Sequence, residues 1–440
     1  MPDKPVSYPT FSEALRFWLK LGFISFGGPT GQIAIMHEEL VEKRKWISEG
    51  RFLHALNFCM LLPGPEATQL ATYVGWLLHK TRGGIAAGVL FVLPSVFLLW
   101  ALSFIYVKFG DVAWVNSVFY GLKPAVVAIV AAAVLRIGSR ALKNMTMWTI
   151  ALIAFLAISV LKIPFPLIIF TAAAIGLIGA KLFPRTFVVS TTPDVVPAPD
   201  QTPVISDVEI SAAVRPSWRR TFQVLAVCLA LWWTPVWLTG WALGWNHALF
   251  REGIFFSQAA MTTFGGAYAV LPYVSQHAMN AGWLSAGQML DGLGLAETTP
   301  GPLIMVLQFV GFLGGWQHPG NLPPLLAATL GALITTWTTF VPCFLWIFLG
   351  APHIEQLRKN VKLTSALATV TAAVVGVVLN LAVWFGSHVL FPPADHGRRL
   401  DVFALALAAI AFVGLWRWKW SLIPVIAGAG ILGVVHQFVF

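Results

Sequence analysis

The sequence is dominated by long apolar stretches separated by short polar connections. A helix needs about 20 mostly apolar residues to cross the hydrocarbon core of a bilayer, and stretches near that length recur along the whole chain. With 58% apolar and 10% charged residues among its 440, the chain departs strongly from soluble domains, which are about 45–50% apolar and 25% charged. We predict an all-α polytopic protein with roughly 10–13 membrane segments. The stretches are 84–106, 112–135, 145–161, 164–183, 221–241, 248–269, 323–350, 363–390, 402–418 and 421–440.

Charge and cysteine content exclude several functional classes. The formal net charge of +10 comes from cations that stand singly or in short loops, which indicates membrane anchoring and not nucleic-acid binding. The three cysteines are far apart and form no C-x-x-C motif, so neither a disulfide framework nor a metal site is expected. Nucleophile-elbow, zincin and Walker A motifs are absent. We therefore expect no enzymatic activity, no cofactor and no ATP-driven pumping.

A proline-rich stretch at 184–217 divides the chain. It holds six prolines and four acidic residues with little apolar periodicity, a composition typical of a linker. Lysine and arginine flank it on both sides, which predicts a cytoplasmic location by the positive-inside rule. The predicted organisation is a first module at 1–183, a linker at 184–217 and a second module at 218–440.

The two modules repeat the same motifs in the same order. Duplicated membrane modules with helices interrupted at matching positions are typical of secondary transporters, whose substrate site lies at the repeat interface near the bilayer midplane. We therefore predict a transporter built from two homologous modules, arranged as inverted repeats. The matching pairs are Ser-Phe-Gly-Gly at 25–28 with Thr-Phe-Gly-Gly at 263–266, Trp-Ile-Ser at 46–48 with Trp-Leu-Ser at 283–285, Leu-Pro-Gly-Pro at 62–65 with Thr-Pro-Gly-Pro at 299–302, and Leu-Pro-Ser at 93–95 with Val-Pro-Cys at 341–343.

Each Pro-Gly-Pro must interrupt its helix, because proline lacks an N–H and glycine permits positive φ. Within a bilayer, freed backbone groups are tolerated only inside protein or along a wet cavity. Residues 54–78 and 289–311 are therefore predicted to form broken or re-entrant helices that face an internal site. A helix that restarts after the break points its free N–H groups at that site, which favours an anion. The alternative is that Pro-Gly-Pro merely kinks two packed helices, and that the Gly-Gly pairs serve helix packing.

Candidate site residues lie at these breaks and at a few intramembrane charges. Lys123 lies in mid-span and is the predicted counter-charge of the anion, whereas Arg136, Arg140 and Lys143 are interpreted as anchors at the helix end. Intramembrane carboxylates are functional candidates by default, and Glu252 lies in the helix that leads to the second Gly-Gly pair. The candidates for proton coupling or gating are Glu66, Asp291 and Glu297. The candidates for binding are Gly27, Gly28, Asn57, Gly64, Pro65, Thr68, Gln69, Lys123, Gly265, Gly266, Thr298, Thr299 and Gly301.

Four segments of the first module resemble the bacterial chromate transporter family: Phe-Gly-Gly-Pro at 26–29, Trp-Ile-Ser at 46–48, the run at 52–66 and Gly-Leu-Lys-Pro at 121–124. Segments 263–274 and 297–302 are similar to the second domain of that family. The resemblance implies a bacterial inner-membrane exporter of chromate that confers chromate resistance, with sulfate as a competing analogue. The predicted site then holds a tetrahedral dianion, with export driven by the membrane potential, a proton gradient or both.

The alternatives are an anion channel, a transporter of sulfate or another oxyanion, and a membrane enzyme such as a chromate reductase. No flavin, haem or iron–sulfur motif supports the enzyme. The lipid bilayer is an expected partner, and a homodimer is one option for the assembly.

Overall fold

The structure is a computed structural model that describes residues 8–26, 28–110, 112–187, 218–351, 361–394 and 397–439. These residues are helical throughout, apart from a short antiparallel pairing of β1 (Pro393–Ala394) with β2 (Gly397–Arg398). Of the predicted linker, Pro184–Phe187 form a short helix, α8, and 188–217 lie outside the described residues, as does Gly27. The boundaries proposed for the linker and the two modules stay predictions.

Seven helices in the described ranges are long and apolar enough to cross a membrane. This confirms a helical polytopic membrane protein. Further apolar stretches form shorter helices, such as α6 (Met145–Ser159) and α18 (Val402–Trp416), and one of the seven is 44 residues long. The predicted number of 10–13 membrane segments stays a prediction. The seven are Glu66–Phe109, Ala113–Ala141, Phe165–Leu182, Trp218–Leu243, Pro324–Gly350, Lys362–Leu390 and Leu422–Val439.

The helices of the two modules follow each other in equivalent order. The first module contains α1 (Phe11–Ile24), α2 (Gly28–His37), the π-helix η1 (Glu38–Lys43), α3 (Glu49–Cys59), α4 (Glu66–Phe109), α5 (Ala113–Ala141), α6 and α7 (Phe165–Leu182). The second contains α10 (Trp218–Leu243), α11 (Ala248–Thr262), α12 (Ala267–Asn280), α13 (Ala286–Thr298), the 3-10 helix η2 (Leu303–Met305), α14 (Val306–Gln317), α15 (Pro324–Gly350), α17 (Val361–Leu390), α18 and α19 (Leu422–Val439).

Local signals in the sequence fix several helix boundaries at repeated positions. The Ser48 hydroxyl accepts the Arg51 N–H and begins α3, while Ser285 and Gln288 form a capping box that begins α13. A serine at this position satisfies an N–H that would otherwise lack a partner in the first helical turn. The repeated Trp-x-Ser motif is therefore a helix start. Helix α4 has non-helical backbone at His79 and Lys80, so it consists of two helices that correspond to α14 and α15.

The modules are interlocked through their last three helices. Helix α17 packs against α6 and α7 of the first module, and α5 packs against α18 and α19 of the second. Small residues make these contacts close: a Cβ on Gly176 of α7 would lie 2.2 Å from the Thr369 Oγ1, and a Cβ on the equivalent Gly433 of α19 would lie 2.6 Å from the Gly121 nitrogen. The last helices of each module therefore pack closely against helices of the other module.

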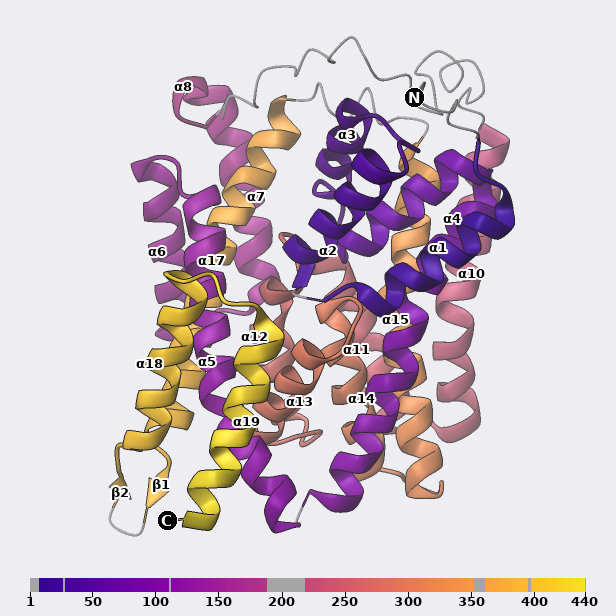
Figure 1. Ribbon diagram of the computed structural model, residues 1–440. Coiled ribbons are helices and arrows are strands. Elements are labelled where there is room, and N and C mark those ends of the chain that lie inside the picture. Colours follow the sequence, from indigo (N-terminus) through magenta and orange to yellow (C-terminus); the bar gives the residue numbers. More distant parts are fainter. Residues whose placement is uncertain are drawn as a thin grey trace, which may run out of the picture.

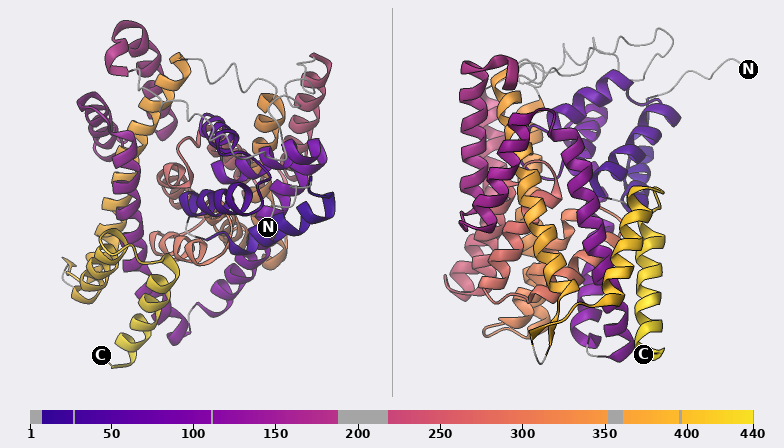
Figure 2. Two further views of the ribbon diagram at one scale, coloured as in Figure 1. Left: turned by 45° about the horizontal axis from the view of Figure 1, so that its top comes forward. Right: turned by 90° about the vertical axis from the view of Figure 1, so that its left-hand side faces the viewer.

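The helices form two groups, which lie on the left and on the right of the left-hand view in Figure 2. One group, here called the frame, contains α5 to α7 and α17 to α19. The other, the break group, contains α1 to α4 and α10 to α15 and carries both Pro-Gly-Pro segments. In Figure 1, α1 to α3 with α6 and α7 lie in the upper half of the molecule, whereas α11 to α14 with α18 and α19 lie in the lower half.

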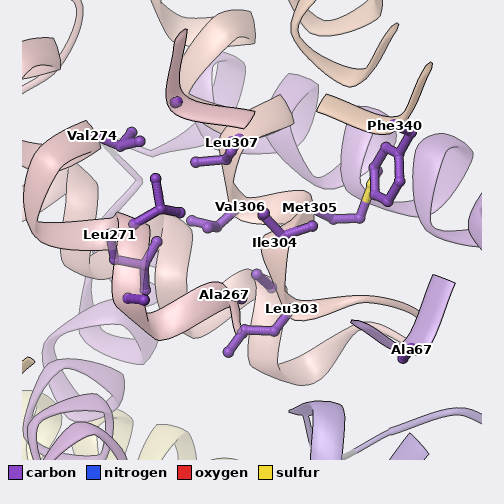
Figure 3. Close-up of a cluster of buried hydrophobic side chains, with 14 of the residues drawn as sticks. Ala67, Ala267, Leu271, Val274, Leu303, Ile304, Met305, Val306, Leu307 and Phe340 are labelled. Carbon is purple, nitrogen blue, oxygen red and sulfur yellow. The ribbon is translucent and has the colours of Figure 1, made fainter. Parts of the chain in front are cut away.

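The helix restart after the second Pro-Gly-Pro is embedded in apolar side chains. Leu303, Ile304 and Met305 are buried, and they lie among side chains of α12 and α15 (Figure 3). Leu271 of α12 and Phe340 of α15 belong to the same buried cluster. This apolar packing fixes the position of the break and leaves its backbone as the polar feature of the region.

Candidate functional site

Each Pro-Gly-Pro break docks on the Gly-Gly break of the other module. The Gly64 N–H donates to the Thr263 carbonyl at 2.8 Å, and the Gly301 N–H donates to the Ser25 carbonyl at 2.7 Å. Both glycines have positive φ, +120° and +103°, which a residue with a Cβ adopts only under strain. The two hydrogen bonds are equivalent under the sequence repeat, so the breaks form one reciprocal structure between the modules.

A second pair of equivalent residues closes each break. A Cβ on Gly64 would lie 3.1 Å from the Cys343 Sγ of α15, and a Cβ on Gly301 would lie 1.7 Å from the Ser95 Oγ of α4. The Ser95 hydroxyl donates to the Pro300 carbonyl. Ser95 and Cys343 end the Leu-Pro-Ser and Val-Pro-Cys segments matched in the sequence, so each module supplies the side chain that covers the other module's break.

Several buried polar atoms at the breaks have no hydrogen-bond partner among the described residues. Gln69 donates to the Pro63 carbonyl at 2.8 Å and Gln32 donates to the Gly301 carbonyl at 2.5 Å, yet both side-chain oxygens are unpaired. The hydroxyls of Ser25 and Thr68 are also buried and unpaired. Buried polar groups are normally satisfied, so these atoms mark the place where a polar ligand or water is expected.

The predicted counter-charge Lys123 and the predicted coupling residue Asp291 form an ion pair between the frame and the break group. The Lys123 Nζ lies 3.5 Å from one Asp291 oxygen, and the Tyr106 hydroxyl donates to the other at 2.9 Å. The Asp291 side chain is 6% exposed and that of Lys123 is 27% exposed. In this conformation the lysine charge is therefore neutralised by a carboxylate.

Two arginines of the same helix, α5, accompany the other two carboxylates. Arg136 lies close enough to Glu297 and Tyr268 to interact with both electrostatically, and Arg140 interacts in this way with Glu66. The Tyr268 hydroxyl donates to Glu297. Both arginines are exposed. The sequence interpretation as surface anchors missed this proximity, and the signal for it was their spacing of four residues, which places them on one helix face.

Other predicted residues have different positions. The hydroxyls of Thr298 and Thr299 donate to carbonyls of their own helix, at 2.7 and 3.1 Å. In this conformation neither hydroxyl proton is available to donate to a ligand. Asn57 is exposed on α3. Pro65 begins α4 as its N-cap. The three described Gly-Gly residues, Gly28, Gly265 and Gly266, all have positive φ.

The two Gly-Gly breaks also approach each other, because a Cβ on Gly266 would lie 3.9 Å from the Pro29 ring. The binding roles of all these residues stay predictions.

A cavity of about 320 Å³ lies between α7, α10, α11 and α12. Its walls include Phe170, Trp232, Trp233 and Tyr273, with few polar groups and no lysine or arginine. A dianion needs cationic or N–H partners to replace its water, so this apolar cavity is not the anion site.

Two copies of one helical unit, each interrupted at Pro-Gly-Pro and docked on the other copy, define a duplicated polytopic membrane protein of the transporter class. The model of the family described as chromate transporter matches residues 12–177 and 250–434. The chain belongs to the chromate transporter family, which is a family of transporters and not of enzymes.

Several curated relatives match over nearly the full length. A chromate transport protein of Pseudomonas aeruginosa is 32% identical, with 98% of this chain and 92% of the relative covered. One from Cupriavidus metallidurans is 28% identical, with 97% and 93% covered. A probable chromate transport protein of Synechococcus elongatus is 27% identical, with 97% and 96% covered. No solved structure matches the chain.

Proposed function

We propose that this protein exports chromate from the cytoplasm across the bacterial inner membrane by alternating access, and so confers chromate resistance. The observation that carries the mechanism is the reciprocal docking of Gly64 on Thr263 and of Gly301 on Ser25. Equivalent contacts related by a sequence repeat allow the two modules to exchange roles, which is the basis of alternating access in duplicated transporters. The names of the relatives support chromate as the cargo.

The modules are proposed to be inverted repeats with re-entrant breaks. The equivalent units α1 to α3 and α11 to α13 lie in opposite halves of the molecule, and so do the hairpins α6–α7 and α18–α19 (Figure 1). Helices α3 and α13 end before their Pro-Gly-Pro segments, and the next helices begin at Glu66 and Leu303. Opposite placement brings the two breaks face to face in the interior.

The present conformation is proposed to be open toward the end where α8 ends and α10 begins, here called the linker end. In the second module, α12 packs against α17 and α13 packs against α5 of the frame, whereas the equivalent α2 and α3 make no comparable packing on α5 and α17 in the described residues. The exposed Arg136, Arg140 and Asn57 lie on the elements that this difference leaves uncovered. Substrate would therefore enter from this end.

The linker end is proposed to be cytoplasmic. Lys80 and Arg220 lie together over the Trp76 ring at this end, and Lys181 and Arg185 lie in or next to the last turn of α7. Of the loops at the opposite end, 244–247 and 318–323 contain no lysine or arginine, whereas the loop with β1 and β2 contains Arg398 and Arg399. Cytoplasmic loops carry an excess of these residues, so the arginines of α5 face the cytoplasmic entrance.

The charges of α5 supply the attraction for a dianion. Arg136 and Arg140 would draw chromate toward the breaks, where the unpaired hydroxyls of Ser25 and Thr68 and the backbone N–H groups replace its water. Protonation of Asp291 would release Lys123 to the anion, which links proton and anion binding. Export of a dianion from an inside-negative cell gains about 4.6 kcal/mol for each 100 mV, so the membrane potential can drive it.

The test is uptake of radiolabelled chromate into inside-out vesicles, with the potential and the pH gradient set independently. We expect saturable, potential-driven accumulation, a raised KM in Arg136→Gln and Arg140→Gln, and no change in Lys143→Gln, which has no carboxylate partner in the described residues. Accumulation of sulfate but not chromate would identify a transporter for another oxyanion. Flux that never saturates would indicate a channel. The homodimer and competition by sulfate stay predictions.

A further inference from the structure

Glu252 is a buried carboxyl that belongs to none of the groups described above. It lies near the start of α11, with 0% of the residue exposed, and neither carboxyl oxygen has a hydrogen-bond partner in the described part of the chain. Two glycines make room for it: a Cβ on Gly314 of α14 would lie 2.2 Å from one oxygen, and a Cβ on Gly331 of α15 would lie 2.9 Å from the other. The carboxyl group is therefore enclosed by backbone.

The first module does not carry this feature. The positions equivalent to Glu252 and Gly314 hold Ala14 and Leu77, both buried and apolar. Glu252 with Gly314 in the second module and Ala14 with Leu77 in the first module therefore occupy equivalent positions in the same fold. The carboxyl group is thus not required for the repeat architecture, and its retention without a partner needs another reason.

No cation in the described residues neutralises Glu252. On its own helix and N-cap, Arg251 is exposed and His247 contacts the Pro319 carbonyl. His277 of α12 stacks on Phe255, and His318 after α14 contacts the Gly282 carbonyl. Helix α14 contains no ionisable residue. The ionisable residues of α10 and α15 are Arg219, Arg220, Cys228 and Cys343, which lie more than two helical turns along their helices from the positions nearest Glu252.

An isolated carboxylate in apolar surroundings is far more costly than the neutral acid, so the group holds a proton here.

A line of polar groups leads from Glu252 toward the first Pro-Gly-Pro break. Thr335 lies one turn beyond Gly331 on α15, and its hydroxyl oxygen is buried without a partner of its own in the described residues. Thr339 and Cys343 follow at spacings of four residues on the same face, and Cys343 closes the Gly64 break. Helix α11, which carries Glu252 near its start, lies in the lower half of the molecule in Figure 1, away from the linker end.

We propose that Glu252 is a proton-binding site, loaded from the side opposite the linker end, whose protonation is coupled to anion movement; this rests on the proposed function. When the modules exchange conformations, α11 and α14 separate and admit water. Glu252 then gives its proton to the Thr335 oxygen while the Thr335 hydroxyl passes its own proton to that water, and the carboxylate is reloaded in the other conformation. The first module has no equivalent of this site, because Ala14 stands at the matching position. The site is separate from Asp291, whose protonation acts on Lys123.

The experiment uses the purified protein in proteoliposomes, with the potential held at zero and a pH gradient imposed. One coupled proton per turnover predicts about tenfold chromate accumulation for each pH unit in the wild type, since a tenfold ratio corresponds to about 1.4 kcal/mol. Glu252→Gln keeps the neutral shape of the protonated side chain, so it retains chromate counterflow but accumulates none. Glu252→Asp restores accumulation. Glu38→Gln, at an exposed carboxylate, is the matched control.

The outcomes separate the two proposals. Wild-type protein without chromate counterflow would refute the proposed function itself. Counterflow with no accumulation in the wild type, or full accumulation in Glu252→Gln, would overturn the proton site and leave the transporter intact. Loss of counterflow in both Glu252→Gln and Glu252→Asp would also overturn it, because the carboxyl group would then serve folding. Infrared absorbance of a protonated carboxyl that disappears in Glu252→Gln supports it independently of transport.

Discussion

Replacement of Lys123 by alanine tests whether the ion pair with Asp291 or the cargo determines the role of this lysine. At 3.5 Å, the attraction between unit charges is about 5 kcal/mol at an effective dielectric constant of about 20. Lys123→Ala leaves the Asp291 carboxylate, which is 6% exposed, without its ion-pair partner. We expect this to lower the free energy of unfolding by about 3–5 kcal/mol. Asp291→Asn leaves the Lys123 ammonium without its partner, but that side chain is 27% exposed and retains access to water. The expected loss in the free energy of unfolding is therefore about 1–3 kcal/mol.

The assay is a double-mutant cycle on the free energy of unfolding in mixed detergent micelles, with chromate transport measured in parallel. We expect Lys123→Ala to be the more destabilising single change and Lys123→Ala/Asp291→Asn to recover most of the loss. If Lys123 also binds chromate, the stable double variant does not transport. Equal destabilisation by the two single changes would refute the argument from burial, and wild-type transport by the double variant would refute the binding role.

Three further predictions address the breaks, the conformational exchange and the first helix. Gly64→Ala should cost about 1–2 kcal/mol of stability, because alanine is strained at positive φ. Gly301→Ala should cost about 1–3 kcal/mol more, because its Cβ also overpacks against Ser95. Thermal unfolding should therefore show Gly301→Ala as the less stable variant, and Ser95→Ala should restore stability to Gly301→Ala but not to Gly64→Ala. Val126 lies 3.4 Å from the Cβ position of Gly294, so a cysteine pair at 126 and 294 should cross-link in this state. The equivalent pair, at Val374 and Asn57, should cross-link only in the opposite state; simultaneous full cross-linking of both pairs would exclude alternating access. Hydrogen bonds from the Thr10 backbone N–H and hydroxyl lower the pKa of Glu13 below its ordinary value. The stability that Glu13 contributes is therefore present above its unfolded-state pKa of about 4.3 and is lost as the pH falls through the lower folded-state value. Glu13→Gln should flatten the pH dependence of thermal stability in that acidic range, and an unchanged profile would show that the cap is not formed in solution.

The repeated motifs predict which residues lie at the breaks but not what they contact. Glycine and proline impose an interruption at Gly64 and Gly301 through local sterics, and the structure has both outside helices. That each break docks on the other module depends on packing between segments about 200 residues apart, such as Gly64 with Thr263. A single sequence shows the matching motifs and does not show whether they meet within a module or across the two.

The charged residues show the same limit from another side. Lys123 and Asp291 were predicted in separate roles, as anion partner and coupling group. The sequence indicates that both lie deep in the membrane, but it does not indicate that they pair with each other. Arg136 and Arg140 follow a helix end, where arginine is usually an anchor. Only the placement of α5 beside the breaks brings these arginines near Glu297 and Glu66.

The scaffold follows the repeat, and its ionisable groups do not. The reciprocal pairs Gly64–Thr263 and Gly301–Ser25 are equivalent, whereas the positions that match Lys123, Asp291 and Glu252 hold Thr371, His54 and Ala14. Equivalent packing in two arrangements keeps the two end states close in free energy, so modest differences in ligand affinity shift the population between them. A ligand shifts that equilibrium only by binding the two states unequally. The unequal charges are therefore what distinguishes one state from the other for an anion or a proton, while the sign and size of the gradients decide the direction in which net transport proceeds.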